Sequence, residues 1–228
     1  MLDAVLLEWE GVLADTGAAR RDALLRALAD EGVPWTTAAY DACCGGLDVR
    51  TAAAVAVARA GCADATLAEL VALRATRSFV ERLARGFTLT PGAAAFIAAA
   101  AHQSRVAIVT RAGRAETEIA LQLSGLGTAI AVVVTADDGG DPPPAPVSFV
   151  RALAHLARNR AVRSQRTVAM LHTSFAVRAA RGAGVRTLAV GAPAHVALDA
   201  DAAVDELPGL TIEAIASLLG VAPAPRPA

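Results

Sequence analysis

The sequence predicts an α/β fold, in which a parallel sheet lies between helices and a long helical segment follows the first strand. A short apolar run at residues 4–7 is typical of a buried parallel strand. Residues 15–88 show helical spacing without strand-like alternation. Four further strand-like runs alternate with segments of helical periodicity. They lie at residues 105–110, 129–135, 167–171 and 187–190.

Length and composition limit the class of protein. At 228 residues, the chain can form one domain of ordinary size plus a smaller inserted one. It is 55% hydrophobic, but it has no run of about 18 strongly apolar residues, so no transmembrane helix is expected. The N-terminus lacks the basic-then-apolar pattern of a secretory signal, and Glu8 and Glu10 interrupt its apolar run. The net charge of −1 gives no indication of nucleic-acid binding.

The basic and sulfur-containing residues are also informative. All 21 basic residues are arginine, so the chain has no lysine to neutralise a phosphate or to form a Schiff base. The three cysteines, Cys43, Cys44 and Cys62, are an odd number without metal-ligand spacing. They are interpreted as packing residues in a reducing compartment, and the predicted location is the cytoplasm.

The long helical segment contains three clear periodic stretches. Gly32 and Pro34 end the first of them, because glycine and proline commonly follow a helix. The three stretches lie at residues 20–31, 51–60 and 66–85.

Polar side chains follow the first two predicted strands. Glu8 and Glu10 come at alternate positions after the strand at 4–7, and Gly11 then allows a sharp turn. Ligands of open α/β sheets bind at the carboxyl ends of strands. The second strand ends in Thr110, with Arg111 directly after it. A threonine at this place can cap a helix N-terminus or bond a ligand, and both roles stay open.

The remaining elements alternate regularly. Residues 137–146 indicate a turn followed by an extended, proline-rich segment. Residues 222–228, rich in proline and alanine, are predicted to be a disordered tail. Helices are predicted at residues 93–102, 116–123 and 149–157.

Two stretches resemble motifs of the haloacid dehalogenase superfamily of phosphohydrolases, in the branch that contains β-phosphoglucomutase and phosphoglycolate phosphatase. The first motif of that family is an apolar strand, Asp-x-Asp-Gly, an apolar pair, and Asp-Ser or Asp-Thr. The matching residues are Gly11, Val12, Leu13, Asp15 and Thr16. The fourth motif is Glu-Asp-Ser-x-x-Gly-Val-x-Ala-Ala-x-x-Ala-Gly. The matching residues are Val177, Ala179, Ala180, Ala183 and Gly184.

This resemblance implies a haloacid-dehalogenase-type Rossmannoid core, with a parallel sheet between helices and an inserted α-helical cap. It implies a core at residues 1–14 and 89–221 and a cap at residues 15–88.

The resemblance also implies roles for individual residues. Arg50, in the loop at 45–51, would be the cap residue that reaches an anionic substrate, and a solvated surface charge is the equally open alternative. Thr110 would bond the transferring phosphoryl group, and Arg111 is a further candidate for substrate binding.

The chain departs from the family at three motifs. Glu8 and Glu10 stand where the family has the aspartate nucleophile and the aspartate general acid/base. The longer side chains displace the oxygens by roughly 1 Å, and such a displacement can cost about a hundredfold in rate. The family's lysine falls on Asp141 or on Pro143, depending on how the prolines are aligned, and neither is basic.

The residues at the family's metal site differ most from the family pattern. The two acids that hold Mg²⁺ in the family are Leu171 and His172 here, and Mg²⁺ requires hard oxygen ligands. Glu8, Glu10 and His172 could instead bind a softer transition metal. The favoured alternative is that His172 fills the site and pairs with Glu8 or Glu10, so that no metal is expected.

These departures favour a family member that has lost phosphoryl transfer. It would act by binding, as a structural or regulatory subunit of a larger assembly or as a sensor of a phosphorylated metabolite, without a cofactor. The alternative is a metal-dependent phosphatase of small phosphorylated metabolites, with Glu8 as nucleophile and Mg²⁺ as cofactor. Acids that line an open pocket would favour the phosphatase, whereas acids bonded to His172 and arginines would favour the binding protein.

Overall fold

A computed structural model describes residues 2–138 and 145–221 of the chain. Its centre is a six-stranded sheet with the order β3-β2-β1-β4-β5-β6, and every pairing is parallel. The predicted α/β fold with a haloacid-dehalogenase-type Rossmannoid core is therefore confirmed. The strands are β1 (Ala4–Leu7), β2 (Arg105–Val109), β3 (Val132–Val134), β4 (Thr167–Leu171), β5 (Arg186–Val190) and β6 (Ala202–Val204).

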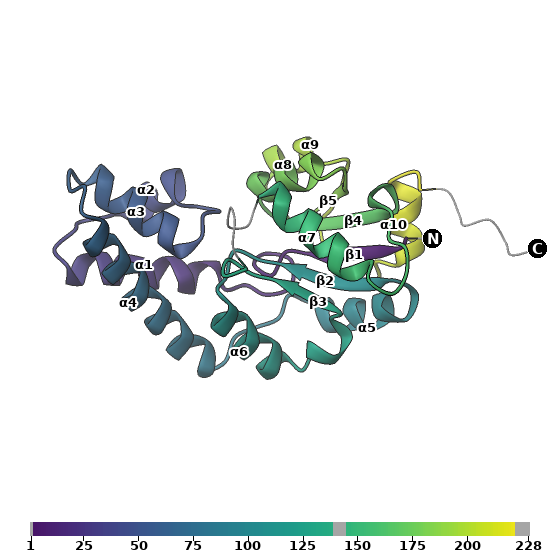
Figure 1. The fold of residues 1–228 in the computed structure, drawn as a ribbon, viewed down its shortest axis with the longest axis horizontal. Helices are drawn as coiled ribbons and strands as arrows, with labels where there is room; N and C mark the ends of the chain where they lie inside the picture. Colours follow the sequence, from purple (N-terminus) through teal and green to yellow (C-terminus); the bar gives the residue numbers. More distant parts are fainter. Residues whose placement is uncertain (1, 139–144, 222–228) are drawn as a thin grey trace, which may run out of the picture.

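The first strand lies in the middle of the sheet (Figure 1). Leu6 of β1 is in register with Ala107 of β2 on one side and with Ala169 of β4 on the other. All four residues of β1 are buried, which explains why the strand is a continuous apolar run rather than an alternating one. The carboxyl end of β1 therefore opens between the ends of β2 and β4.

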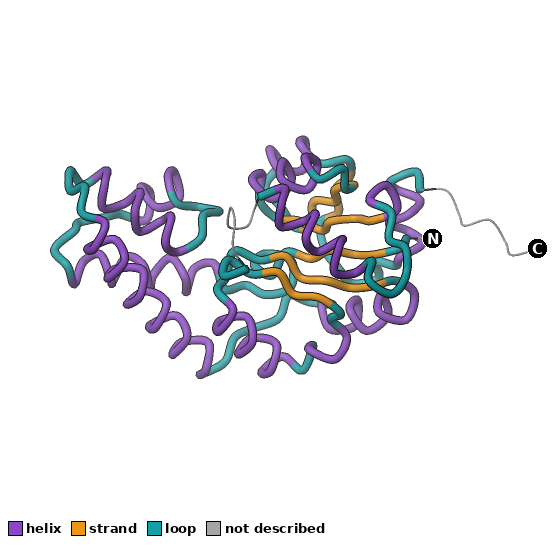
Figure 2. The backbone as a smooth tube through the Cα atoms, viewed as in Figure 1, coloured by secondary structure: helices purple, strands orange, loops and turns teal. Residues whose placement is uncertain are grey.

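Helices cover both faces of the sheet (Figure 2). One face packs against α5 (Ala93–Gln103), α6 (Arg114–Ser124) and α10 (Ile212–Leu218). The other face packs against α7 (Pro146–Leu156), α8 (Ser174–Gly182) and α9 (Ala194–Asp199). Small alanine side chains on these helices allow close contact with the strands, as Ala152 and Ala180 do on the second face.

Four helices between β1 and α5 form a separate bundle beside the sheet (Figure 1). They are α1 (Gly17–Asp30), α2 (Thr37–Cys43), α3 (Val49–Arg59) and α4 (Ala65–Ala84). The bundle has its own apolar cluster, in which Leu28, Val57 and Val71 are buried. Three of the helices begin at side-chain caps, supplied by Thr36, Asp48 and Asp64. The domain boundaries at residues 14–15 and 88–89 stay a prediction.

Several elements differ from the expectation. The short helix α2 was not predicted as a separate element within the helical segment at 15–88, and the short helix α9 was not predicted. Strand β3 has only three residues, because residues 127–129 form a 3₁₀ turn before it. The predicted tail at 222–228 lies outside the described residues, and so do Asp141 and Pro143, the two candidates for the lysine position.

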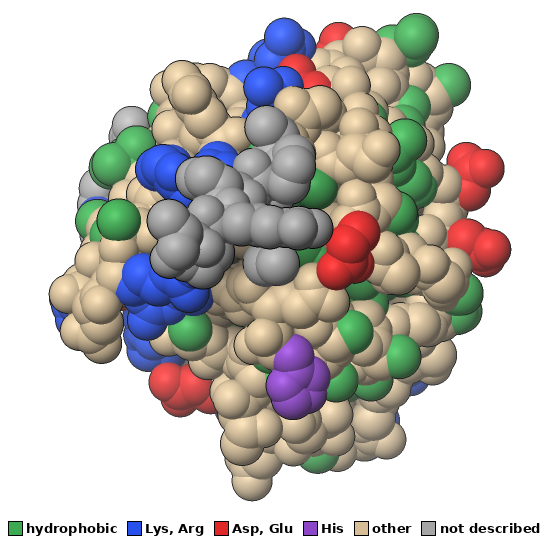
Figure 3. All heavy atoms as spheres, turned by 90° about the vertical axis from the view of Figure 1, so that its right-hand side faces the viewer, with side chains coloured by type: hydrophobic (Ala, Val, Ile, Leu, Met, Phe, Trp, Pro, Cys, Tyr) green, Lys and Arg blue, Asp and Glu red, His purple; other side chains and the backbone are tan. Residues whose placement is uncertain are grey.

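Within residues 2–138 and 145–221, no helix combines the length and the apolar character needed to cross a membrane. On the side that lies at the right of Figure 1, hydrophobic side chains are interspersed with charged ones (Figure 3).

Candidate functional site

Glu8 lies at the carboxyl end of β1 and is bonded to the start of α8. Its Oε2 accepts hydrogen bonds from the backbone N–H groups of His172 (2.7 Å) and Thr173 (3.3 Å). Its Oε1 accepts one from the Thr173 hydroxyl at 3.0 Å. Thr173 is also the N-cap of α8, since its Oγ1 accepts from the Ala176 N–H. Glu8 therefore serves the backbone N–H groups that the start of α8 leaves unpaired.

The environment of Glu8 disfavours its charged form. Burial raises the pKa of Glu8, because a carboxylate loses its hydration in the interior. The hydrogen bond from the His172 backbone and the charge of Arg111 act in the opposite direction, with a smaller effect.

Glu10 is held by two arginines. Its Oε1 pairs with Nε of Arg20 and lies 3.5 Å from the Thr16 hydroxyl. Its Oε2 accepts from Nε of Arg111 at 2.8 Å and also from Nη2 of the same guanidinium. Burial alone would raise the pKa of Glu10, but Arg111 and Arg20 outweigh it and lower the pKa to about 2. Glu10 is therefore ionised at neutral pH and is fully occupied as an ion-pair partner.

The two arginines extend this contact into a network across the molecule. Arg20, from α1, also pairs with Oε2 of Glu116 on α6 at 2.9 Å, and its guanidinium lies 4.1 Å from the ring centre of Phe79 on α4. Arg111 reaches the backbone carbonyl of Leu47 in the loop before α3 at 3.3 Å. The network thus joins the ends of β1 and β2 to the helical bundle.

Charges in this network balance. Glu10 and Glu116 face Arg20 and Arg111, and each of the four side chains is at least 89% buried. The two carboxylates raise the pKa of Arg20 against the effect of burial, and Glu10 does the same for Arg111. A buried charge requires such pairing, because an isolated one carries a large desolvation penalty.

His172 meets Glu8 through its backbone and not through its ring. Nδ1 of the imidazole lies 3.1 Å from the carbonyl oxygen of Val190. The ring packs against Gly11, where an added Cβ would lie 2.3 Å from Cγ of His172. The predicted pairing of His172 with Glu8 is therefore made by the backbone N–H of His172. The ring takes up the space beside the turn at Gly11.

The hydroxyl of Thr110 does not cap a helix. Its Oγ1 accepts from the N–H of Ala112 at 3.1 Å, which forms a local turn. Helix α6 starts at Arg114 with Gly113 as N-cap, and the Gly113 N–H donates to Oε2 of Glu116 at 3.2 Å. The N-cap alternative for Thr110 was therefore wrong, and its phosphoryl-binding role stays a prediction.

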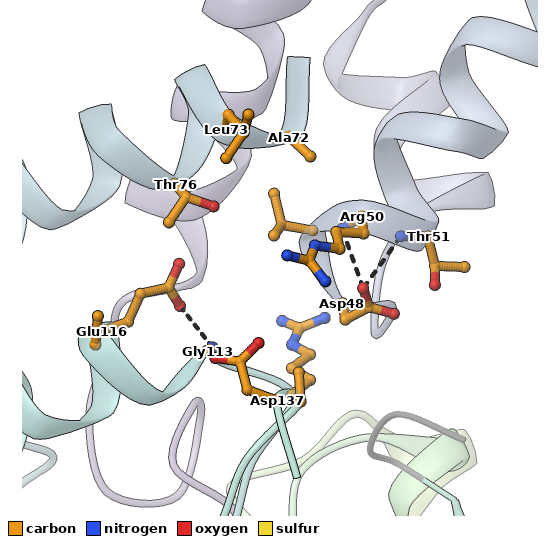
Figure 4. Close-up of a pocket in the computed structure, with 13 residues that line it drawn as sticks. Asp48, Arg50, Thr51, Ala72, Leu73, Thr76, Gly113, Glu116 and Asp137 are labelled. Carbon is orange, nitrogen blue, oxygen red and sulfur yellow. Dashed lines mark hydrogen bonds between the residues drawn. The ribbon is translucent and has the colours of Figure 1, made fainter. Parts of the chain in front are cut away.

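A pocket of about 490 Å³ lies between the helical bundle and the sheet. Arg50, Thr76 and Leu73 line it from the bundle, and Gly113, Glu116 and Asp137 line it from the core (Figure 4). Arg50 points into this space in Figure 4. Its side chain is 67% exposed, and its Nε lies 3.8 Å from Glu69.

The pocket does not bring the predicted residues together. Arg50 and Arg111 line it, whereas Glu8, Glu10 and Thr110 do not. The lining carries two guanidiniums and the three carboxylates of Asp48, Glu116 and Asp137. It therefore lacks the excess of positive charge expected around a phosphate.

The residues at the end of β1 do not fit Mg²⁺. The Leu171 side chain has no ligand atom, both oxygens of Glu8 are bonded to residues 172–173, and Glu10 is bonded to arginines. Glu8, Glu10 and His172 do not converge either, and the described part of the chain holds no group of three His, Cys, Asp or Glu residues arranged for a metal.

Sequence reasoning missed Arg20, Glu116 and Thr173. Arg20 was treated as the first residue of an amphipathic helix, and Glu116 as the first residue of another. The one available signal is that Arg20 sits on the apolar face of its helix, beside Ala23 and Leu24, where an unpaired arginine would be unfavourable.

The chain matches the model of the haloacid dehalogenase-like hydrolases over residues 6–190. The chain therefore belongs to the haloacid dehalogenase-like hydrolase family. A comparison with curated proteins gave no match.

Solved structures agree with this assignment. CbbY from Rhodobacter sphaeroides, in complex with phosphate, is 25% identical, with a TM-score of 0.80 over 94% of this chain and 99% of that one. β-Phosphoglucomutase from Clostridium difficile is 15% identical, with a TM-score of 0.83 over 96% and 98%. YfnB from Bacillus subtilis, described as a HAD-type hydrolase bound to magnesium, is 17% identical, with a TM-score of 0.66 over 96% and 99%. The last two show the fold alone. The predicted membership of the haloacid dehalogenase superfamily is confirmed by the family model.

Proposed function

We propose that this chain acts by binding, as a structural or regulatory subunit or as a sensor of a phosphorylated metabolite, and does not carry out the family's phosphoryl transfer. The observation that supports this role is the state of Glu10. Both of its oxygens pair with the guanidiniums of Arg20 and Arg111.

A general acid/base must exchange a proton near neutral pH. The pKa of Glu10 is about 2, so this carboxyl holds no proton to donate at pH 7. Moving the Glu10 carboxylate towards a substrate would leave two buried guanidiniums without their partner, which is strongly unfavourable.

A carboxylate nucleophile must direct a lone pair at phosphorus. The oxygens of Glu8 are bonded to the start of α8, and Glu8 does not line the pocket. The chain also has no lysine to compensate the charge of a phosphate, and the residues at the end of β1 do not fit Mg²⁺.

A second candidate function is a metal-dependent phosphatase of small phosphorylated metabolites with Glu8 as nucleophile. Family membership and the likeness to CbbY bound to phosphate favour this candidate more directly than they favour the first. Glu8 retains a carboxylate at the end of β1, and Thr110 retains a hydroxyl at the end of β2.

A phosphatase assay on the purified chain distinguishes the two candidates. The substrates are a panel of sugar phosphates and phosphoglycolate, tested with Mg²⁺, Mn²⁺, Co²⁺ or no metal. Glu8→Gln is the matched control, since it keeps the shape of the side chain and removes its charge. We expect wild type and Glu8→Gln to release phosphate at the same background rate.

Metal-dependent turnover that Glu8→Gln abolishes would reject the binding role and establish the phosphatase. Turnover that survives in Glu8→Gln would indicate a contaminating enzyme, and a second purification would then remove it from both samples alike. Without turnover, a pull-down with the tagged chain tests for the protein partner or larger assembly that the binding role includes.

A further inference from the structure

A second groove lies between α1 and α4, apart from the pocket described above. It encloses about 240 Å³, and it shares none of its lining residues with the first pocket. Its floor is formed by small side chains of α1, namely Ala18, Ala19 and Ala23. Because these side chains end at Cβ, the two helices leave a hollow along their line of contact.

Three guanidinium groups surround this hollow. Arg26 comes from α1, one turn beyond Asp22, whereas Arg82 and Arg85 come from the end of α4. Ser78 adds a hydroxyl from α4. These residues follow helical spacing on both helices, so their side chains share one side of the helix pair.

The charges in this groove are not balanced. The single acid of the lining, Asp22, lies 3.5 Å from Nε of Arg21, which stands outside the groove. Nε of Arg85 donates to the backbone carbonyl of Glu81 at 3.2 Å. For the side chains of Arg26 and Arg82, the structure of residues 2–138 and 145–221 contains no hydrogen bond or ion pair. The lining therefore carries two positive charges in excess.

From these observations we infer that the α1/α4 groove binds a small anion of the phosphate type. Guanidinium groups donate paired hydrogen bonds that match phosphate oxygens. Pockets for drug-sized ligands enclose about 300–1,000 Å³, so the smaller groove fits a phosphoryl or pyrophosphoryl group rather than a nucleotide.

The floor of the groove also connects it to the Glu10 network. Ala23 packs in one cluster with Phe79 and Leu83, and the ring of Phe79 lies under the guanidinium of Arg20. Ala23 and Phe79 therefore link the lining of the groove to Arg20. This inference does not depend on the proposed function, because the groove contains none of the candidate site residues.

Calorimetric titration with inorganic pyrophosphate tests the inference, in about 0.1 M NaCl, where attraction by distant surface charges is screened beyond about 10 Å. The test variant is Arg26→Gln/Arg82→Gln. The matched control is Arg59→Gln/Arg158→Gln, which removes two exposed arginines elsewhere on the chain. Circular dichroism verifies that each variant is folded.

We expect the wild type to bind pyrophosphate, the test variant to bind at least about tenfold more weakly, and the control to bind within about twofold of wild type. Absence of binding by wild type would overturn the inference. An equal loss in the control would also overturn it, because the attraction would then be general. Loss of pyrophosphate binding in Arg50→Gln, with binding by the test variant unchanged, would also overturn the inference, because the anion would then bind in the first pocket.

Discussion

Arg111 donates from both Nε and Nη2 to one oxygen, Oε2, of Glu10. The same side chain reaches the carbonyl oxygen of Leu47, so one guanidinium connects the end of β2, the turn after β1 and the loop before α3. At the position where the family's mechanism requires a general acid/base that exchanges a proton, this chain has a buried ion pair.

Removing the charge of Glu10 should destabilise the fold. In Glu10→Gln, the guanidiniums of Arg20 and Arg111 would lose their shared partner while they stay buried. We expect the free energy of unfolding to fall by about 3–5 kcal/mol, measured by urea denaturation. Glu69→Gln removes an exposed carboxylate near Arg50 and should change it by less than about 0.5 kcal/mol. Equal effects of the two substitutions would contradict a structural role for the network.

The Glu10 pair should make stability depend on acid pH. Its pKa is lowered in the folded chain to about 2 from an ordinary value of 4.5. The unfolded chain therefore binds the proton first, and the stabilisation is present above pH 4.5 and is lost as the pH falls towards 2. We expect wild type to lose about 3 kcal/mol more than Glu10→Gln across this window, measured as the free energy of unfolding. Parallel pH profiles would show that the pKa is not shifted.

The contribution of Glu8 to the pH dependence of stability should have the opposite sign. Because its pKa is raised in the folded chain, its contribution is present below 4.5 and is lost as the pH rises through the raised pKa. The same titration of Glu8→Gln therefore serves as an internal comparison. Relative to wild type, this variant should become more stable as the pH rises, whereas Glu10→Gln should become less stable.

Thr173 has two roles, and a comparison with Thr211 distinguishes them. Thr173→Val would remove the N-cap of α8 and the hydroxyl that donates to Oε1 of Glu8. Thr211→Val would remove only an N-cap, that of α10. We expect thermal or urea unfolding to show a loss of about 1 kcal/mol for Thr211→Val and about 2–3 kcal/mol for Thr173→Val. Equal losses would mean that the bond to Glu8 contributes nothing to stability.

Gly11 should tolerate no side chain while His172 is present. Its φ of +81° is strained for alanine, and the added Cβ would lie within 2.4 Å of two atoms of the imidazole ring. Gly32→Ala measures the strain alone, since Gly32 has a φ of +72° and open space around it. We expect Gly32→Ala to cost about 1–2 kcal/mol and Gly11→Ala clearly more, in urea denaturation.

A double substitution tests the cause of this extra cost. If the clash with the ring is responsible, Gly11→Ala/His172→Ala should be less destabilised than the sum of the two single variants. Additive losses would exclude the clash and leave the backbone conformation as the whole explanation.

The sequence alone determined the parallel sheet, the helical segment after the first strand and the edge of the sheet at which Glu8, Thr110 and His172 follow their strands. Each of these depends on local patterns: continuous apolar runs for buried strands, helical periodicity, and the position of a polar residue directly after a strand. A helix of only about two turns, such as α2, was not distinguished as a separate element.

The partners of the two acids were decided only by the tertiary structure. Glu8 contacts residues 164 and 165 positions away, and Arg111 lies 101 positions from Glu10. Arginine is long and flexible, so its sequence position does not determine which carboxylate it reaches. Packing α1 against α4 and placing α6 beside them brings Arg20 to Glu10 and Glu116. Burial makes this pairing necessary, because an unpaired charge would carry a large desolvation penalty.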